Sequence, residues 1–185
     1  MKKIIIGNGK IEAPEIGLGC MRITGLDNEK EIRTLIDTAM EEGIYFFDHA
    51  DIYASGQAEA AFGEAITPSL REKMILQTKC AIHPGTCYDF SKEHILRSAD
   101  ESLKRLKTDY IDILLLHRPD TLMEPEEVAE AFETLEKAGK VKYFGVSNQN
   151  SMQMELLNQY CGGRILIDQL QLSIAHCDIM DSGIN

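Results

Sequence analysis

The chain has 185 residues, 44% of them hydrophobic, and a formal net charge of -11. This composition predicts one globular domain with a sizeable core, and the acidic excess argues against binding to nucleic acid or to anionic membranes. No stretch has the length of a signal peptide or a membrane span. Five cysteines without a C-x-x-C pair indicate a reducing compartment, so we expect a soluble cytoplasmic protein.

The N-terminal segment predicts a β-hairpin, and strand-like and helix-like segments alternate after it. Asn8-Gly9 lies between two short apolar runs, which is typical of a tight turn. Apolar runs that indicate strands follow at 15–21, 44–50, 73–79, 110–117, 141–148 and 164–173. They recur roughly every 30 residues, which is the length of one βαβ unit.

Three of the intervening segments carry clear helix signals. Asn28 precedes Glu31 by three residues, as in a capping box. Ser91 can cap a second helix, and Pro125 suits the first turn of a third. Continuous apolar strands separated by amphipathic helices predict a parallel sheet covered by helices.

A (β/α)8 barrel and an open doubly wound sheet both fit this alternation. Polar groups follow four of the strands, in FFDHADIY, LQTK, LLLHRPD and FGVSN, and in a barrel such strand ends meet on one face. An open dinucleotide-binding sheet is expected to carry G-x-G-x-x-G after an early strand. The segment GLGCMR has Arg22 in place of the third glycine. We therefore predict an α/β fold of the TIM-barrel class.

Asp48, Tyr53, Lys79 and His117 follow successive strands in an order that resembles the aldo-keto reductase superfamily. The resemblance covers nearly the whole chain, through GLGCMR, FDHADIYASGQAEAAFGEA, DILLLHRPD, GKVKYFGVSN and DQLQLS, and HADIY and HRPDTLM resemble most a bacterial oxidoreductase branch. It implies an NADPH-dependent enzyme that reduces an aldehyde or ketone to an alcohol. It also implies that residues 1–185 form a single partial barrel domain with about six of the eight βα units.

The four residues suit the chemistry that this resemblance implies. Hydride addition to a carbonyl builds charge on oxygen, so a proton donor must lie beside that oxygen. Tyr53 is the expected donor, and the charge of Lys79 would favour its phenolate form. Asp48 would hold and balance the lysine, while His117 would orient the substrate carbonyl.

The resemblance also implies a set of residues around the NADPH cofactor: Met21, Arg22, Asp48, Ser147, Asn148 and Gln169. Ser147, Asn148 and Gln169 match positions that hydrogen-bond the nicotinamide carboxamide. Met21 and Arg22 match the loop that borders the cofactor, although simple packing explains Met21 equally well.

Two other functions stay open from the sequence. Lys79 would be the nucleophile of a Schiff-base aldolase on a similar barrel, or the chain would be a non-catalytic fragment whose open sheet edges pair with another copy or chain. His49 and Asp51 lack further ligands at suitable spacing, so no metal site is predicted.

The length of the chain adds one further expectation. A complete barrel typically has about 250 residues, so a truncated chain would lack the loops that hold the cofactor phosphates and would be inactive alone. The carbonyl substrate, the choice between NADP and NAD, and the oligomeric state are not predicted.

Overall fold

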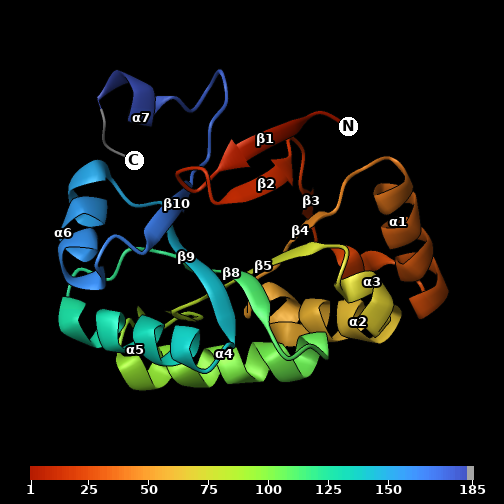
Figure 1. Cartoon of the computed structure of the whole chain (residues 1–185), viewed down its shortest axis with the longest axis horizontal. Helices are drawn as coiled ribbons and strands as arrows, with labels where there is room; N and C mark the ends of the chain where they lie inside the picture. Colours follow the sequence, from red (N-terminus) through yellow and green to blue (C-terminus); the bar gives the residue numbers. More distant parts are fainter. Residues whose placement is uncertain (183–185) are drawn as a thin grey trace.

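The computed structural model describes residues 1–182, and its centre is a parallel sheet (Figure 1). The six strands run in chain order: β3 (Leu18–Gly19), β4 (Phe46–Asp48), β5 (Ile75–Cys80), β8 (Ile111–Leu116), β9 (Val141–Ser147) and β10 (Ile165–Gln169). Each strand of the sheet pairs with the one before it, without the reversal of order that marks a doubly wound sheet. This strand order is that of a (β/α) barrel, as predicted.

Helices cover the outer side of the curved sheet (Figure 1). They are α1 (Glu29–Glu41), α2 (Gln57–Ala65), α3 (Pro68–Arg71), α4 (Lys92–Leu106), α5 (Pro125–Lys137) and α6 (Ser151–Cys161), and the short α7 (Asp178–Asp181) follows β10. The predicted caps are present: the Asn28 side chain accepts a hydrogen bond from the Glu31 N–H, and Ser91 accepts one from the His94 N–H. Pro125 occupies the first turn of α5.

Two hairpins accompany the sheet. β1 (Lys3–Ile6) and β2 (Ile11–Pro14) pair antiparallel around Asn8 and Gly9, whose φ angles of 54° and 88° suit a tight hairpin turn. This confirms the predicted hairpin, which packs against the inner face of the sheet. A second hairpin, β6 (Ile82–His83) with β7 (Cys87–Tyr88), follows β5 and was not predicted.

The sequence overestimated the length of three strands. The predicted strand at 44–50 is reduced to Phe46–Asp48, that at 15–21 to Leu18–Gly19, and that at 164–173 to Ile165–Gln169. Within residues 1–182 the outer strands β3 and β10 pair with the sheet on one side only, so fewer hydrogen bonds hold their ends in extended form.

Alternation along β5 separates its apolar side chains, which pack against the helices, from polar side chains on the inner side of the sheet. On β5, Leu76 and Cys80 belong to the clusters between sheet and helices, whereas Gln77 and Lys79 take part in polar contacts. The helix layer is closely packed, with the Phe132 and Phe144 rings stacked at a centroid distance of 4.2 Å. The apolar layer therefore fixes the strands whose other face carries the candidate site.

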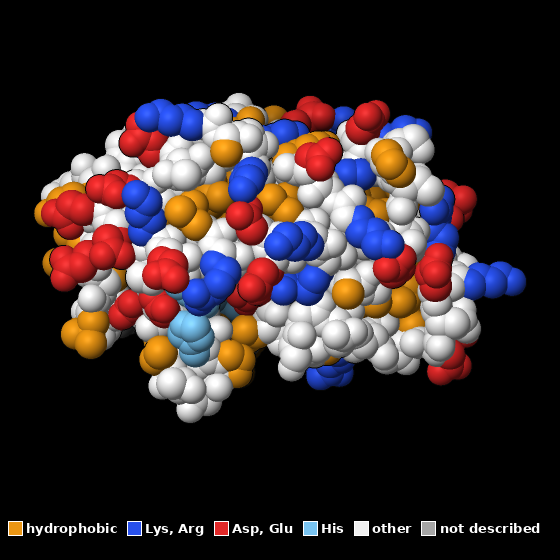
Figure 2. Space-filling model, turned by 90° about the horizontal axis from the view of Figure 1, so that it is seen from below, with side chains coloured by type: hydrophobic (Ala, Val, Ile, Leu, Met, Phe, Trp, Pro, Cys, Tyr) orange, Lys and Arg blue, Asp and Glu red, His pale blue; other side chains and the backbone are white. Residues whose placement is uncertain are grey.

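Acidic and basic side chains are interspersed on the face seen in Figure 2. Ion pairs between the helices and their loops include Lys92 with Glu130 at 2.8 Å and Lys140 with Asp100 at 2.6 Å. Among residues 1–182, no helix combines the length and the apolar character needed to cross a bilayer.

Candidate active site

The ammonium of Lys79 is the centre of the candidate site. Its Nζ atom lies 2.7 and 2.8 Å from the two carboxylate oxygens of Asp48 and 2.8 Å from the His49 carbonyl oxygen. The same atom donates to the phenolic oxygen of Tyr53 at 3.2 Å. Lys79 is only 2% exposed, so these partners take the place of the water that a buried cation loses. Three of the four predicted catalytic residues are thus joined directly.

Backbone pairing beyond the end of β4 places Tyr53 beside this lysine. The His49 N–H donates to the Gln77 carbonyl at 2.8 Å, and the Asp51 N–H donates to the Lys79 carbonyl at 2.9 Å. These bonds continue the parallel ladder between β4 and β5 past Asp48, the last residue of β4. The chain then forms a short kinked turn at Tyr53–Gly56, in which Ala54 and Ser55 have left-handed backbone angles. The loop is therefore held in register with the strand that carries Lys79.

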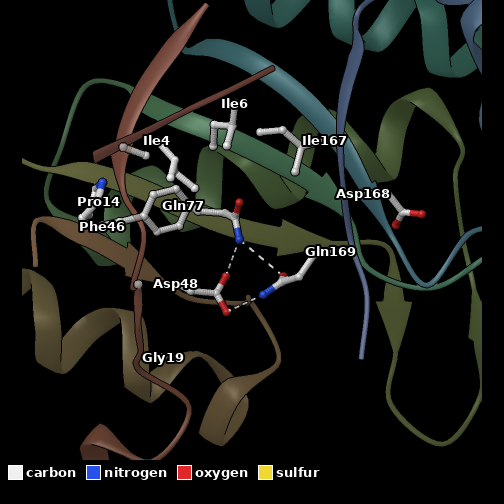
Figure 3. A pocket seen from close by; sticks show the side chains of 12 residues that line it. Ile4, Ile6, Pro14, Gly19, Phe46, Asp48, Gln77, Ile167, Asp168 and Gln169 are labelled. Carbon is white, nitrogen blue, oxygen red and sulfur yellow. Dashed lines mark hydrogen bonds between the residues drawn. The ribbon is translucent and has the colours of Figure 1, made fainter. Parts of the chain in front are cut away.

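Two glutamines complete the hydrogen bonds of the Asp48 carboxylate (Figure 3). Gln77 donates to Oδ1 at 2.6 Å, and Gln169 donates to Oδ2 at 3.3 Å. Gln77 also donates to Gln169 Oε1 at 3.3 Å. Sequence reasoning missed Gln77, although it precedes Lys79 by two residues and therefore faces the same side of β5.

His117 lies next to Tyr53, with their rings perpendicular at a centroid distance of 6.0 Å. Burial lowers the pKa of His117 to about 4, helped by the charges of Lys79 and Arg118 and opposed by Asp48. Its Nδ1 atom is buried and has no hydrogen-bond partner among the described residues. The ring is therefore neutral near pH 7 and offers one donor and one acceptor nitrogen.

Ser147 and Asn148 link the end of β9 to the same site. The Asn148 side-chain nitrogen donates to Ser147 Oγ at 2.8 Å and to the His117 carbonyl at 3.4 Å. Ser147 Oγ donates to the Gln169 carbonyl at 2.9 Å. The residues predicted from β9 and β10 are thus brought together with those from β4, β5 and β8.

Met21 and Arg22 lie apart from this network. Both are exposed and follow Cys20, whose N–H donates to the Asp48 carbonyl at 2.8 Å. Within the described chain, no hydrogen bond or ion pair joins Met21 or Arg22 to the Asp48 cluster. Arg22 instead borders a small cavity of about 170 Å³.

Two larger cavities adjoin the site. The first, of about 400 Å³, lies on the inner side of the sheet and has apolar walls that include Ile4, Phe46 and Ile167, with Asp48 at one end (Figure 3). Figure 3 shows Asp168 directed away from these side chains. The second, of about 380 Å³, is lined by Tyr88, Arg118, Pro119, Asn148, Gln171 and His176. A ligand in either cavity meets residues of the hydrogen-bonded network.

A second polar cluster lies behind the site. The fully buried Glu59 carboxylate accepts hydrogen bonds from Thr78 Oγ1 and, at 2.7 Å, from Arg105 Nε. Burial and the charge of Glu59 raise the pKa of Asp51 to about 7, against the opposing effect of Arg105. One Asp51 oxygen is buried without a partner among the described residues. This carboxyl therefore titrates near neutral pH.

The His49 side chain is fully buried and packs against an aromatic ring. Its ring meets that of Phe62 edge-on, with centroids 4.6 Å apart. Burial lowers its pKa to about 3, so the imidazole is a neutral core group near pH 7.

Comparisons with known proteins agree with this arrangement. Residues 15–183 match the model of the Aldo/keto reductase family. The chain is 44% identical over 167 residues to the uncharacterized oxidoreductase YcsN of Bacillus subtilis, covering 84% of this chain and 56% of that protein. It is 36% identical over 189 residues to a 6-dehydroglucose reductase of Novosphingobium aromaticivorans, covering 96% and 62%.

Solved structures give the same result. The thermostable aldo-keto reductase Tm1743, crystallised with the inhibitor epalrestat, matches with a TM-score of 0.87 at 30% identity, over 100% of this chain and 67% of that one. The chain therefore spans somewhat more than half the length of the curated relatives that it matches. Its sheet corresponds to the (β/α)8 barrel of these enzymes. The chain belongs to the aldo/keto reductase family.

Proposed function

We propose that this site reduces an aldehyde or ketone to an alcohol with a hydride from NADPH. The observation that carries the proposal is the direction of the hydrogen bond between Lys79 and Tyr53. An ammonium has three hydrogens, and Lys79 directs them to Asp48, to the His49 carbonyl and to the phenolic oxygen. Because that oxygen accepts, the hydroxyl hydrogen of Tyr53 is left to donate to a substrate oxygen.

The remaining roles follow from charge and position. NADPH, when bound, supplies the hydride. Tyr53 gives its proton to the carbonyl oxygen as negative charge develops there, and the fixed positive charge of Lys79 stabilises the phenolate that remains. Asp48 neutralises the lysine. The neutral His117 donates one N–H to the carbonyl oxygen and so orients the substrate.

The end of β9 and β10 suits the nicotinamide end of the cofactor. Asn148 uses its amide nitrogen for Ser147 and His117, while its carbonyl oxygen has no hydrogen bond among the described residues. That oxygen can accept a hydrogen bond from the nicotinamide carboxamide. Ser147 donates to the Gln169 carbonyl and Gln169 donates to Asp48, so these two residues fix the position of Asn148. We assign Met21 and Arg22 to the border of the cofactor site from the family resemblance.

The contacts of Lys79 disfavour the aldolase alternative. A Schiff-base lysine must present a neutral amine to a carbonyl carbon. Here the nitrogen is enclosed by an ion pair with Asp48 and by two further acceptors, and the side chain is almost fully buried, so the nitrogen is not presented to a substrate. Borohydride added with a carbonyl substrate is therefore expected to leave Lys79 unmodified. A covalent adduct at Lys79, identified by mass spectrometry, would instead support the aldolase.

A chimera provides the direct test of carbonyl reduction. This chain would be joined to the part of YcsN that lies outside the matched region, and NADPH oxidation would be followed with a panel of aldehydes and carbonyl sugars. We expect substrate-dependent oxidation of NADPH with formation of the alcohol. A folded chimera that binds NADPH and reduces none of the panel would count against the proposal. The low activity expected of the 185-residue chain alone is measured in parallel.

Pairing with another chain stays a prediction. β3 and β10 each pair on one side only within the described residues, and a strand with an unpaired edge can add a further strand. Size-exclusion chromatography with light scattering checks this, since a clean monomer at all concentrations would contradict it.

A further inference from the structure

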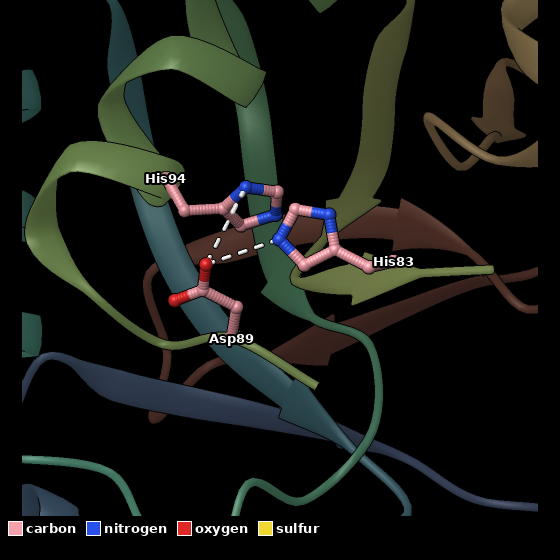
Figure 4. A group of neighbouring side chains, drawn as sticks. All are labelled: His83, Asp89 and His94. Carbon is pink, nitrogen blue, oxygen red and sulfur yellow. Dashed lines mark hydrogen bonds and ion pairs between the residues drawn. The ribbon is translucent and has the colours of Figure 1, made fainter. Parts of the chain in front are cut away.

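Three side chains with metal-binding atoms converge outside the candidate active site (Figure 4). His83 belongs to β6, Asp89 follows β7, and His94 lies in the first turn of α4. His83 Nε2 is 3.0 Å from Asp89 Oδ2, and His94 Nδ1 is 3.9 Å from the same oxygen. One ligand atom from each residue lies within 4.8 Å of the other two. The second hairpin is what brings these three residues together.

The surrounding hydrogen bonds hold the carboxylate and the buried imidazole in place. Asp89 Oδ1 accepts a hydrogen bond from the Ser91 N–H at 2.9 Å, which leaves Oδ2 for the two histidines. His94 Nε2 lies 3.4 Å from the Ser98 hydroxyl, so this nitrogen can carry the ring proton while Nδ1 offers its lone pair. Histidines that bind metals use their second nitrogen in this way.

We propose that His83, Asp89 and His94 bind one divalent transition-metal ion of the zinc class. Two imidazole nitrogens and one carboxylate oxygen are the donors that zinc, cobalt and nickel accept, whereas magnesium and calcium prefer oxygen alone. Metal bonds of about 2.0 to 2.2 Å in a tetrahedral shell place neighbouring ligand atoms roughly 3.3 to 3.5 Å apart. The two observed separations, 3.0 and 3.9 Å, lie on either side of this range.

One neighbouring cation competes with the ion. Arg97 Nη2 lies 3.0 Å from His94 Nδ1, the atom that the metal would use. Arg97 is exposed, and its other terminal nitrogen lies 3.7 Å from Glu93. The guanidinium can therefore turn toward Glu93 when the ion binds. Removing it is expected to strengthen metal binding.

The site is distinct from the proposed catalytic cluster, whose chemistry needs no metal, so the inference stands without the proposed function. Its position suggests what the ion would do. The Asp89 N–H donates to the Ala81 carbonyl, and the Phe90 N–H donates to the Asp120 carboxylate at 3.1 Å. Tyr88 of the same hairpin lines the cavity beside Arg118. An ion would thus tie α4 to a hairpin that borders the candidate site.

Titration calorimetry of the full chain with Zn²⁺, and the visible spectrum of added Co²⁺, test the proposal. We expect one ion per chain and a Co²⁺ spectrum typical of low coordination number. His83→Ala and Asp89→Asn, both at partly exposed residues, should weaken Zn²⁺ binding at least tenfold, whereas Arg97→Ala should strengthen it. Cys87→Ser, at an exposed thiol of the same hairpin, and His176→Ala should leave the affinity within twofold.

Circular dichroism of each variant confirms that it is folded. Absence of saturable Zn²⁺ and Co²⁺ binding would overturn the proposal. So would equal affinity in the original chain and in both His83→Ala and Asp89→Asn, because the ion would then be bound elsewhere.

Discussion

The ammonium of Lys79 donates a hydrogen bond of 3.2 Å to the phenolic oxygen of Tyr53. The lysine is simultaneously paired with Asp48, so the phenol faces a fixed and balanced positive charge rather than a mobile one. Such preorganised charge stabilises a transition state without the reorganisation that water would require. The stability and the reactivity of this site should therefore depend on the same three groups.

The Asp48–Lys79 ion pair should show strong coupling in stability. Lys79→Met leaves a largely buried carboxylate without its cation, and the loss of one member of a buried pair typically costs about 3 to 5 kcal/mol. Asp48→Asn combined with Lys79→Met removes both charges and should recover much of that loss. Urea unfolding of the single and double variants measures the coupling. Lys73→Met, at an exposed position before β5, is the control, and a double variant no more stable than Lys79→Met would contradict the prediction.

His117 should remain neutral from pH 5 to pH 8. Its folded-state pKa of about 4 lies below the ordinary value of about 6.5, so the unfolded chain takes up the proton first as the pH falls. The free energy of unfolding is therefore highest above pH 6.5 and falls as the pH decreases from 6.5 to 4. At pH 5 the loss is up to about 2 kcal/mol. NMR titration of the ring protons checks this. A midpoint near 6.5 would show that the ring is not buried as described.

Asp51 should destabilise the protein above neutral pH. Its folded-state pKa of about 7 is higher than the ordinary 3.8, so ionisation costs stability progressively as the pH rises from 3.8 to 7. Asp51→Asn removes that cost and should raise the free energy of unfolding by about 2 to 4 kcal/mol at pH 8, but by less than about 1 kcal/mol at pH 4. Asp27→Asn, at an exposed carboxyl, should show little change at either pH. A gain independent of pH would contradict the assignment.

Gly63 should be intolerant of a side chain. A Cβ atom there would lie 2.2 Å from the Arg105 carbonyl oxygen, which is backbone of α4. Gly63→Ala must therefore separate α2 from α4, and overpacking of this kind typically costs about 1 to 3 kcal/mol. At Gly25 a Cβ would meet nothing within 4 Å, so Gly25→Ala serves as the matched control. Equal unfolding midpoints for the two variants would show that the helices do not meet as described.

The predictable part of the fold was the part with local signals. The caps at Asn28 and Ser91 and the turn at Asn8 depend on residues close in sequence, and the structure contains all three. α2 was missed because its buried positions are mostly small, and α6 was missed although Asn150 and Gln153 form a capping box at its start. Within α2, the buried positions include Ala58 and Gly63, which are small enough for a close helix contact but carry no strong hydrophobic pattern.

The candidate active site was predictable in part. Asp48, Lys79 and His117 follow apolar strands, and parallel strand ends meet at one edge of a sheet, so their proximity follows from order alone. Gln77 is separated by 92 positions from its partner Gln169, and only the fold brings two such residues together. The His83 cluster depends on a short hairpin that was missed, although Pro84 and Gly85 at its turn are a local turn signal.

The measurement that tests the central claim most directly is the rate of carbonyl reduction by Tyr53→Phe in the YcsN chimera. Loss of a positioned proton donor typically lowers a rate 10²- to 10⁴-fold, so we expect a loss of this size with NADPH affinity within about twofold of the unsubstituted chimera. The control is Tyr45→Phe, at the residue directly before β4, which should reduce kcat by less than about twofold. If Tyr53→Phe kept more than half of the original kcat, Tyr53 would not be the proton donor.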